Sequence, residues 1–136
     1  MHALFDEWLK LAAYLGARCV ASRQVIAGAE SCTGGLVSHL LTQVPGSSAA
    51  LRGSMVTYQT SLKTLELGID PLSIEENGVV SEKTAIAMAE SIRNKWGTTY
   101  GISTTGYLGP NGGDEKAKIG EVWVAVSTSK GTHTKG

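Results

Sequence analysis

The sequence predicts an α/β fold in which helices cover both faces of a layered sheet. Short apolar stretches typical of strands alternate along the chain with stretches whose apolar residues recur at helical spacing. Alternation of this kind is characteristic of layered α/β domains. At 136 residues the chain is long enough to enclose a hydrophobic core, and it shows no internal repeat and no stretch of linker composition. We therefore expect a single domain over residues 1–136.

The first half of the chain predicts a helix, a strand and a second helix. The first helix has apolar residues at steps of four and three, namely Leu4, Trp8, Leu11, Leu15 and Cys19. This period predicts that these residues form its buried face. A short strand is expected over 25–29, and a helix over 33–43 that ends before the Pro45-Gly46 turn.

The second half predicts three more strands and the longest of the later helices. A strand is expected over 55–58, a short helix over 61–67 and a connection with one helical turn over 71–78. Ser81 is placed to cap a longer helix, whose apolar residues are Ala85, Met88, Ala89, Ile92 and Trp96. Strands over 100–104 and 121–128 follow, separated by the glycine-rich loop 105–113.

Composition and charge argue against several classes of protein. Lys plus Arg equal Asp plus Glu at 12 each, so no net positive charge attracts nucleic acid or an anionic membrane. No apolar stretch reaches the roughly 20 residues that span a bilayer, and the N-terminus lacks the basic start of a secretory signal. These features favour a cytoplasmic protein with no nucleic-acid or membrane partner.

Cysteine and histidine are too sparse to suggest a metal centre. The two cysteines, Cys19 and Cys32, and the three scattered histidines show neither metal-ligand spacing nor a disulfide framework. We expect no metal ion.

The segment 29–35 is the strongest candidate for a functional site. It reads Ala-Glu-Ser-Cys-Thr-Gly-Gly and joins a predicted strand to a predicted helix. The first N–H groups of a helix lack internal partners, so such a turn can hold an anion or an oxyanion. Ser31 is the most exposed chemical group of the turn, although a helix N-cap is the commoner role of such a serine. Glu30 can cap or orient the neighbouring N–H groups.

Two other segments follow predicted strands and are expected near the same sheet edge, namely 58–63 and the loop 105–113. Lys63 can act as a general base to Ser31 if desolvation lowers its pKa, and Tyr58 can orient the pair or relay a proton. The alternative is that Lys63 is a solvated lysine on a surface helix. The glycines of the loop permit close backbone approach to a phosphate or a ribose, or they belong to a flexible connection.

Cys32 is a second candidate nucleophile in the turn. A thiol at a helix N-terminus can have a lowered pKa. No base is matched to it in the sequence, and a small buried cysteine is the alternative role. We therefore favour Ser31.

Several blocks of the sequence, in order between about residues 11 and 128, resemble the CinA C-terminal domain family. They are the segment 29–35, Val44-Pro45-Gly46-Ser47-Ser48, Val56-Thr57-Tyr58 with Lys63, Leu67-Gly68, Gly78-Val79-Val80-Ser81, the glycine loop and Gly120-Glu121-Val122-Trp123. No single block would suffice, but together they are specific.

The resemblance implies a three-layer α/β/α sandwich with a mixed central sheet and no metal or organic cofactor. It also implies homo-oligomers and an amidohydrolase that converts nicotinamide mononucleotide to nicotinate mononucleotide and ammonia. By motif position, Ser31 would be the nucleophile, Lys63 its base and Tyr58 a supporting proton handler. The positions expected to surround the substrate are Glu30, Thr33, Gly34, Gly35, Thr105, Gly106, Gly109, Gly112 and Gly113.

The chain departs from the family pattern at several positions. Thr60 and Leu62 stand where Asn and Ala are usual, Tyr107-Leu108 replace Ile-Ala, and Asn111 stands where Gly is common. Family members continue after Thr128 through a strand, a Gly-Asp-Arg segment and a last helix, whereas this sequence ends at Gly136 within that strand. We therefore expect a sandwich without the family's last strand and helix. Two hypotheses remain open: a working amidohydrolase, and a degenerate paralogue that binds a nucleotide or a protein without turnover.

Overall fold

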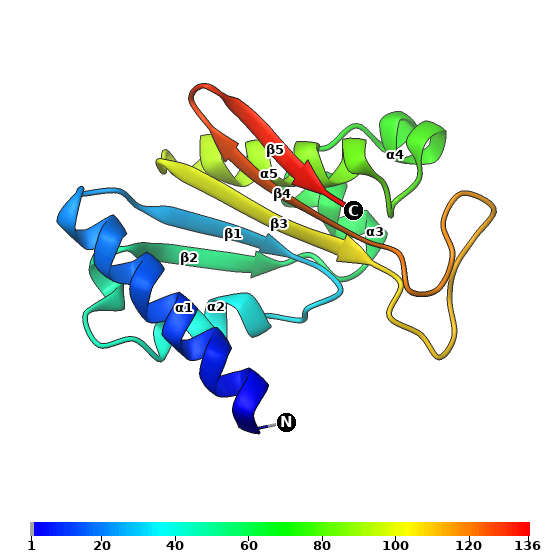
Figure 1. The fold of residues 1–136 in the computed structure, drawn as a ribbon. Helices are drawn as coiled ribbons and strands as arrows, with labels where there is room; N and C mark the ends of the chain where they lie inside the picture. Colours follow the sequence, from blue (N-terminus) through cyan, green and yellow to red (C-terminus); the bar gives the residue numbers. More distant parts are fainter. Residues whose placement is uncertain (1) are drawn as a thin grey trace.

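A computed structural model describes residues 2–136 and shows a five-stranded mixed sheet between two layers of helices (Figure 1). The strands lie in the order β2-β1-β3-β4-β5. Their bounds are Ile26–Glu30 (β1), Leu51–Val56 (β2), Tyr100–Gly106 (β3), Val122–Thr128 (β4) and Gly131–Lys135 (β5). β1 is parallel to β2 and β3, whereas β3, β4 and β5 pair antiparallel. The α/β prediction is confirmed.

The helices divide between the two faces of the sheet (Figure 1). They are α1 (His2–Ala21), α2 (Leu36–Thr42), α3 (Thr60–Leu65), α4 (Pro71–Asn77) and α5 (Glu82–Trp96), with a short 3₁₀ helix η1 over Ser47–Ala49. α1 and α2 pack together beside β1 and β2, and α5 packs across β1, β3, β4 and β5 on the opposite face. None of the helices in the described chain is long and apolar enough to cross a membrane.

The main core lies between α5 and the sheet. Met88 and Ile92 of α5 are fully buried against Ala27 and Ala29 of β1. The close approach of α5 depends on Gly101 of β3, because a Cβ there would lie 2.0 Å from the carbonyl oxygen of Ala89. As predicted, Ser81 caps α5, its hydroxyl accepting the N–H of Thr84 at 3.1 Å. The helical period and the cap together therefore located α5 correctly.

Three predicted elements differ most from the structure, and the boundaries of the others differ by no more than two residues. The strand expected over 55–58 spans Leu51–Val56. Its first residues do not show a strand pattern in the sequence, because Arg52 and Gly53 interrupt the apolar residues. The connection over 71–78 is a full helix, α4, started by Pro71 and by the Asp70 carboxylate, which accepts the N–H of Leu72 at 2.9 Å. The second helix starts at Leu36 rather than 33, since the preceding residues form a turn.

The apolar stripe of α1 is the main error in the predicted core. Leu4 and Leu11 are 51% and 66% exposed, whereas the buried positions of this helix are Ala12, Gly16 and Cys19. Small side chains let α1 approach its neighbours closely, so the larger stripe lies about a quarter turn away on the surface. The period identified the helix correctly but not its buried face.

The residues after Thr128 form a strand, β5, which pairs with β4 at the edge of the sheet. Thr132 and Thr134 of β5 donate hydrogen bonds to Glu90 and Glu82 of α5, at 2.7 and 2.6 Å. The sheet therefore includes a strand after Thr128, contrary to the expectation that this strand is absent.

Candidate active site

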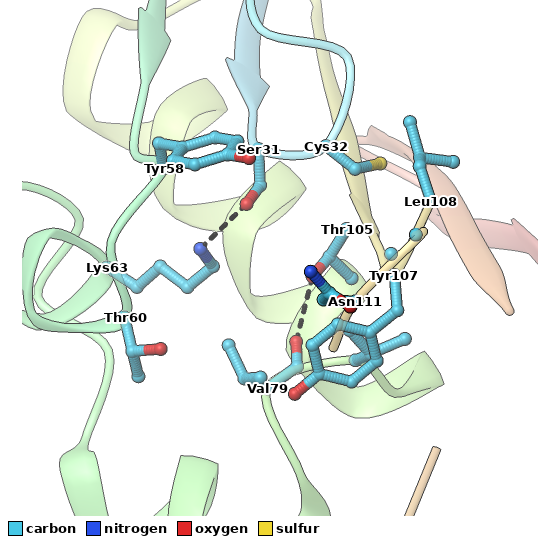
Figure 2. A pocket seen from close by; sticks show the side chains of 13 residues that line it. Ser31, Cys32, Tyr58, Thr60, Lys63, Val79, Thr105, Tyr107, Leu108 and Asn111 are labelled. Atoms are coloured by element: carbon cyan, nitrogen blue, oxygen red, sulfur yellow. Dashed lines mark hydrogen bonds between the residues drawn. The ribbon is translucent and has the colours of Figure 1, made fainter. Parts of the chain in front are cut away.

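A cavity of about 440 Å³ opens where β1, β2 and β3 end, and it gathers all three segments predicted to meet there (Figure 2). Its walls come from the turn after β1, the segment leading into α3, the connection before α5 and the loop after β3. The lining residues are Ser31, Cys32, Tyr58, Thr60, Lys63, Val79, Val80, Thr105, Gly106, Tyr107, Leu108, Gly109 and Asn111. The predicted convergence at this sheet edge is thus present.

Ser31 and Lys63 are in direct contact at the floor of this cavity (Figure 2). The Lys63 amine donates to Ser31 Oγ at 3.0 Å and to the carbonyl oxygen of Thr57 at 2.6 Å. Lys63 is only 1% exposed, and burial lowers the pKa of its amine from 10.5 to about 8. A solvated surface lysine is therefore excluded. A neutral amine within hydrogen-bond distance of a serine hydroxyl can act as its general base.

The backbone of the turn holds Ser31 against β3. Its N–H donates to the carbonyl oxygen of Thr104 at 3.0 Å and to the Thr104 hydroxyl at 3.2 Å. Ser31 does not cap α2, because Gly35 occupies the N-cap position. The N–H of Cys32, the next residue, makes no hydrogen bond to another described residue. Within its own residue, this N–H interacts with the Cys32 thiol.

Glu30 lies next to Ser31 but points away from the cavity. Its buried carboxylate accepts the backbone N–H groups of Val37 and Ser38 at 2.9 and 3.0 Å, together with the hydroxyls of Ser38 and Thr33. Burial raises the pKa of this carboxyl, but the hydrogen bonds from Ser38, Thr33 and Val37 outweigh that effect and leave the pKa below its ordinary value. The first N–H groups of α2 are therefore occupied by an internal anion, which corrects the expectation that they hold a ligand.

The other predicted positions of the turn, Thr33, Gly34 and Gly35, shape the turn that carries Ser31. Thr33 donates to Glu30 at 2.7 Å and contacts the Thr104 hydroxyl at 2.8 Å. Gly34 and Gly35 have φ angles of 60° and 99°, which favour glycine and allow the reversal of the chain. None of these three residues lines the cavity.

Cys32 lines the cavity beside Ser31, with its thiol on the side of the glycine loop (Figure 2). Burial raises the pKa of this thiol above its ordinary value. A thiol that stays protonated is a weak nucleophile. The geometry therefore favours Ser31, which has a base in contact, over Cys32.

Tyr58 lines the cavity but is 70% exposed, and its hydroxyl makes no hydrogen bond to Ser31 or Lys63. It stands at the mouth, above the Ser31–Lys63 pair (Figure 2). A part in proton transfer remains a prediction.

The glycine loop contributes some of its predicted residues to the cavity. Thr105, Gly106 and Gly109 line it, and the buried Thr105 hydroxyl donates to the carbonyl oxygen of Val79 at 2.8 Å. Gly112 and Gly113 lie behind this surface, where Gly112 packs against the ring of Tyr107.

Sequence reasoning missed several lining positions. Thr60, Val79, Val80 and Leu108 were not assigned to the substrate site, although Val79-Val80 and Tyr107-Leu108 lie in or beside the family blocks. Within residues 2–136, no group of three His, Cys, Asp or Glu side chains is placed to hold a metal ion.

The loop is an ordered wall rather than a flexible connection. The Asp114 carboxylate accepts the N–H groups of Lys116 and Ala117, both at 2.8 Å, and the hydroxyl of Tyr107 at 2.9 Å. The Lys116 amine donates to the carbonyl oxygens of Glu75 and Glu76 at the end of α4. These contacts fix the side of the cavity that carries Tyr107.

A model of the CinA C-terminal domain matches residues 9–136 of the sequence. The chain belongs to the CinA C-terminal domain family. It is 46% identical over 125 residues to a CinA-like protein of Salinibacter ruber, which covers 92% of this chain and 30% of that protein. It is 41% identical over 136 residues to a putative competence-damage inducible protein of Acetivibrio thermocellus, covering 99% of this chain and 32% of that protein. The chain thus spans about a third of the length of these curated relatives.

Solved CinA-superfamily structures share the fold. A competence/damage-inducible protein from Agrobacterium tumefaciens superposes with a TM-score of 0.90 at 30% identity, covering 94% of this chain and 78% of that one. A CinA-superfamily protein from Escherichia coli gives the same TM-score and identity over 94% of this chain and 74% of its own. The α/β/α sandwich predicted for the chain is therefore that of the CinA family.

Proposed function

We propose that this CinA domain is an amidohydrolase that uses a Ser31–Lys63 pair, and that its substrate is nicotinamide mononucleotide. The contact between a buried lysine amine with a pKa of about 8 and the Ser31 hydroxyl supports this proposal most directly. A lysine with a lowered pKa beside a serine is an arrangement suited to acyl transfer. The choice of a nicotinamide nucleotide follows from the resemblance within the CinA family.

The first half of the reaction acylates Ser31. Neutral Lys63 takes the hydroxyl proton as Ser31 Oγ attacks the carboxamide carbon, forming a tetrahedral oxyanion. The backbone N–H groups of the turn, that of Cys32 among them, would donate to that oxyanion. Protonated Lys63 then gives its proton to the departing nitrogen, which leaves as ammonia.

The second half releases the acid. A water molecule gives a proton to Lys63 and attacks the nicotinoyl ester, and Ser31 recovers its proton as the C–O bond breaks. Amide and water thus become carboxylate and ammonia without a metal ion or an organic cofactor in the scheme. The Thr57 carbonyl orients the amine throughout, since it accepts one of its N–H groups.

The aromatic wall of the cavity suits a planar ring. Tyr58 and Tyr107 both line it, and the hydrogen bond from the Tyr107 hydroxyl to Asp114 fixes the second ring. Aromatic faces contact a cationic ring such as a pyridinium favourably. Tyr107 replaces the smaller residue usual in the family, and this is also the observation that favours the alternative of binding without turnover.

Ammonia release from nicotinamide mononucleotide by the parent chain and by Ser31→Ala tests the proposal. We expect the variant to lose a factor of at least about 10³ in rate, since the nucleophile is removed. Cys32→Ser is the matched control next to it in the turn and should keep nearly the parent rate.

Three results would contradict this assignment. Equal rates for the parent and Ser31→Ala exclude Ser31 as the nucleophile, and loss of activity in Cys32→Ser alone would transfer that role to the thiol. Tight binding of the nucleotide by a folded parent chain that releases no ammonia would favour the binding-only paralogue.

A further inference from the structure

Tyr107 is fixed in the wall of the cavity by its side chain and by its backbone. Its hydroxyl donates to the Asp114 carboxylate at 2.9 Å. Its N–H donates to the carbonyl oxygen of Glu121 at 3.0 Å, and its own carbonyl oxygen accepts the N–H of Gly120 at 2.6 Å. Figure 2 shows the ring on the side of the cavity opposite Lys63. The ring therefore presents a surface of fixed position to a ligand in the cavity.

The backbone of the glycine loop lies close to this ring. A Cβ at Gly112 would be 3.3 Å from Cδ1 of Tyr107, and the φ angle of Gly112 is 119°, so glycine suits this position on both counts. The other aromatic residue of the cavity, Tyr58, is 70% exposed, and its hydroxyl makes no hydrogen bond to another described residue. Of the two rings, Tyr107 is the one whose position the structure fixes.

Asp114 divides its two oxygens between the loop and the ring. Oδ1 accepts the N–H groups of Lys116 and Ala117, and Oδ2 accepts the Tyr107 hydroxyl. The hydrogen bonds from Lys116, Ala117 and Tyr107 lower the pKa of the Asp114 carboxyl. Burial and the contact with Asp114 raise the pKa of the Tyr107 hydroxyl, which therefore keeps its proton. A phenol that donates to a carboxylate is polarised, and its ring becomes richer in electrons.

An electron-rich ring of this kind suits a ligand ring that carries positive charge. The face of an aromatic ring attracts a cation, more strongly where water is excluded. The ring of a nicotinamide nucleotide is a cationic pyridinium in the oxidised form and a neutral dihydropyridine of nearly the same size in the reduced form. The Tyr107 ring can therefore distinguish the two forms by charge, although their shapes are similar.

We propose that Tyr107 is a specificity-determining residue that selects the cationic ring of the oxidised nucleotide against the neutral ring of the reduced one, and that Asp114 positions and polarises Tyr107. This inference rests on the proposed function and narrows its substrate class. Tyr107 stands where the family usually has isoleucine, so the selection belongs to this chain and not to the shared Ser31–Lys63 chemistry.

Ligand binding by the whole chain carrying Ser31→Ala tests the selection without turnover. Isothermal titration calorimetry at about pH 9, above the Lys63 pKa of about 8, gives the dissociation constants of oxidised and reduced nicotinamide mononucleotide. We expect the oxidised form to bind about tenfold more tightly. Adding Tyr107→Leu should reduce this ratio to about one. Tyr14→Leu, at a position 61% exposed on α1 and outside the cavity, is the matched control and should leave the ratio unchanged.

Asp114→Asn tests the positioning role in the same background. The amide keeps an oxygen for the N–H groups of Lys116 and Ala117, but it turns an NH₂ group toward the Tyr107 hydroxyl. The loop should keep its turn while the ring loses its acceptor, so we expect the ratio to fall to about threefold. Because Asp114 acts through the Tyr107 hydroxyl, adding Tyr107→Phe to Asp114→Asn should lower the ratio no further. Circular dichroism verifies that each variant is folded.

Several outcomes would overturn the proposal. These are equal affinity for the two ring forms, no binding of either form, and a preference that survives Tyr107→Leu. A ratio that Asp114→Asn leaves unchanged would remove Asp114 from the proposal. Ammonia release by the parent is measured separately, so the two proposals can fail independently: selective binding without ammonia release would contradict the amidase alone, and ammonia release without ring selection would contradict this inference alone.

Discussion

Glu30 and Lys63 lie on either side of Ser31, and both are only 1% exposed, yet their surroundings differ in kind. The Glu30 carboxylate accepts hydrogen bonds from two backbone N–H groups and three hydroxyls. Among residues 2–136, the Lys63 amine has two acceptors, Ser31 Oγ and the Thr57 carbonyl oxygen, for the three protons of its charged form.

This difference in hydrogen bonding explains why one buried group stays charged and the other loses its charge. Donors directed at Glu30 stabilise its ionised form against the cost of burial, so its pKa is lowered. Nothing comparable stabilises the Lys63 ammonium, and burial lowers its pKa to about 8. A fully hydrogen-bonded buried charge holds structure in place, whereas an incompletely hydrogen-bonded one supplies chemistry.

The Glu30 carboxylate and the Lys63 amine are kept apart, and this separation matters for the reactivity of Lys63. The Glu30 oxygens are turned toward α2, and no hydrogen bond or ion pair joins them to Lys63 within the described residues. A carboxylate beside Lys63 would hold the amine in its charged form and remove the base. The placement of Glu30 under α2 therefore protects the reactivity of Lys63 while it anchors the turn that carries Ser31.

The largest expected effect is the loss of activity in Lys63→Met. Methionine has a similar volume but accepts no proton, so we expect ammonia release to fall by about 10²–10⁴-fold. Unfolding in urea should show equal or greater stability, because a buried, poorly solvated amine is removed. Lys83→Met, at an exposed position on α5, is the matched control and should change neither quantity. A Lys63→Met variant with the parent rate would exclude Lys63 as the base.

The second expected effect is on the pH dependence of stability. The Lys63 pKa is about 8 in the folded chain and 10.5 when unfolded, so between these values the unfolded state binds more protons. The free energy of unfolding of the parent, relative to Lys63→Met, should therefore rise by roughly 3 kcal/mol from below pH 8 to above pH 10.5. Urea unfolding of both chains across this range measures the difference.

The pH dependence of the catalytic rate should reflect the same titration of the Lys63 amine. The neutral amine is the active form, so kcat/KM of the parent should increase with pH and level off above about 8. If the difference in unfolding free energy between the parent and Lys63→Met does not change with pH across this range, Lys63 has an ordinary pKa in the folded chain. That result would contradict the explanation given for the difference between Lys63 and Glu30.

Much of this site could be predicted from the sequence, because its chemistry lies in short segments at strand ends. Ser31, Lys63 and the glycine loop were each located by local patterns, and the parallel strands of the sheet bring those segments to one edge. The burial of Lys63 could not be predicted in this way, since a lysine on a short helix is ordinarily solvated. Its environment depends on how α3 packs against the turn after β1.

Two other features depend on long-range geometry and could not be predicted from local patterns, namely the hydrogen bonds to Glu30 and the buried face of α1. The donors to Glu30 are Val37 and Ser38, seven and eight residues further along, and only the path of the turn brings them to the carboxylate. In α1, the apolar period cannot distinguish a stripe that faces the core from one that faces a partner. The small residues that contact the core, Ala12 and Gly16, carry little hydrophobic signal.

The smallest expected effect concerns Glu30, the group compared with Lys63. It is the loss of stability in Glu30→Gln. The amide keeps one acceptor oxygen but turns an NH₂ group toward donors, so we expect the free energy of unfolding at neutral pH to fall by about 2 kcal/mol. Glu115→Gln, in the exposed part of the loop, should change it by less than about 0.5 kcal/mol. Urea unfolding measures both variants.

The acid range separates this explanation from a simple packing defect. A carboxyl whose pKa is lowered by folding contributes stability above its unfolded pKa of 4.5 and loses that contribution as the pH falls through the folded value. The difference between the parent and Glu30→Gln should therefore narrow in acid, whereas a defect in packing alone would persist at every pH. Equal stability of the two chains at neutral pH would mean that the α2 N–H groups do not depend on Glu30, and that the contrast with Lys63 does not arise from hydrogen bonding.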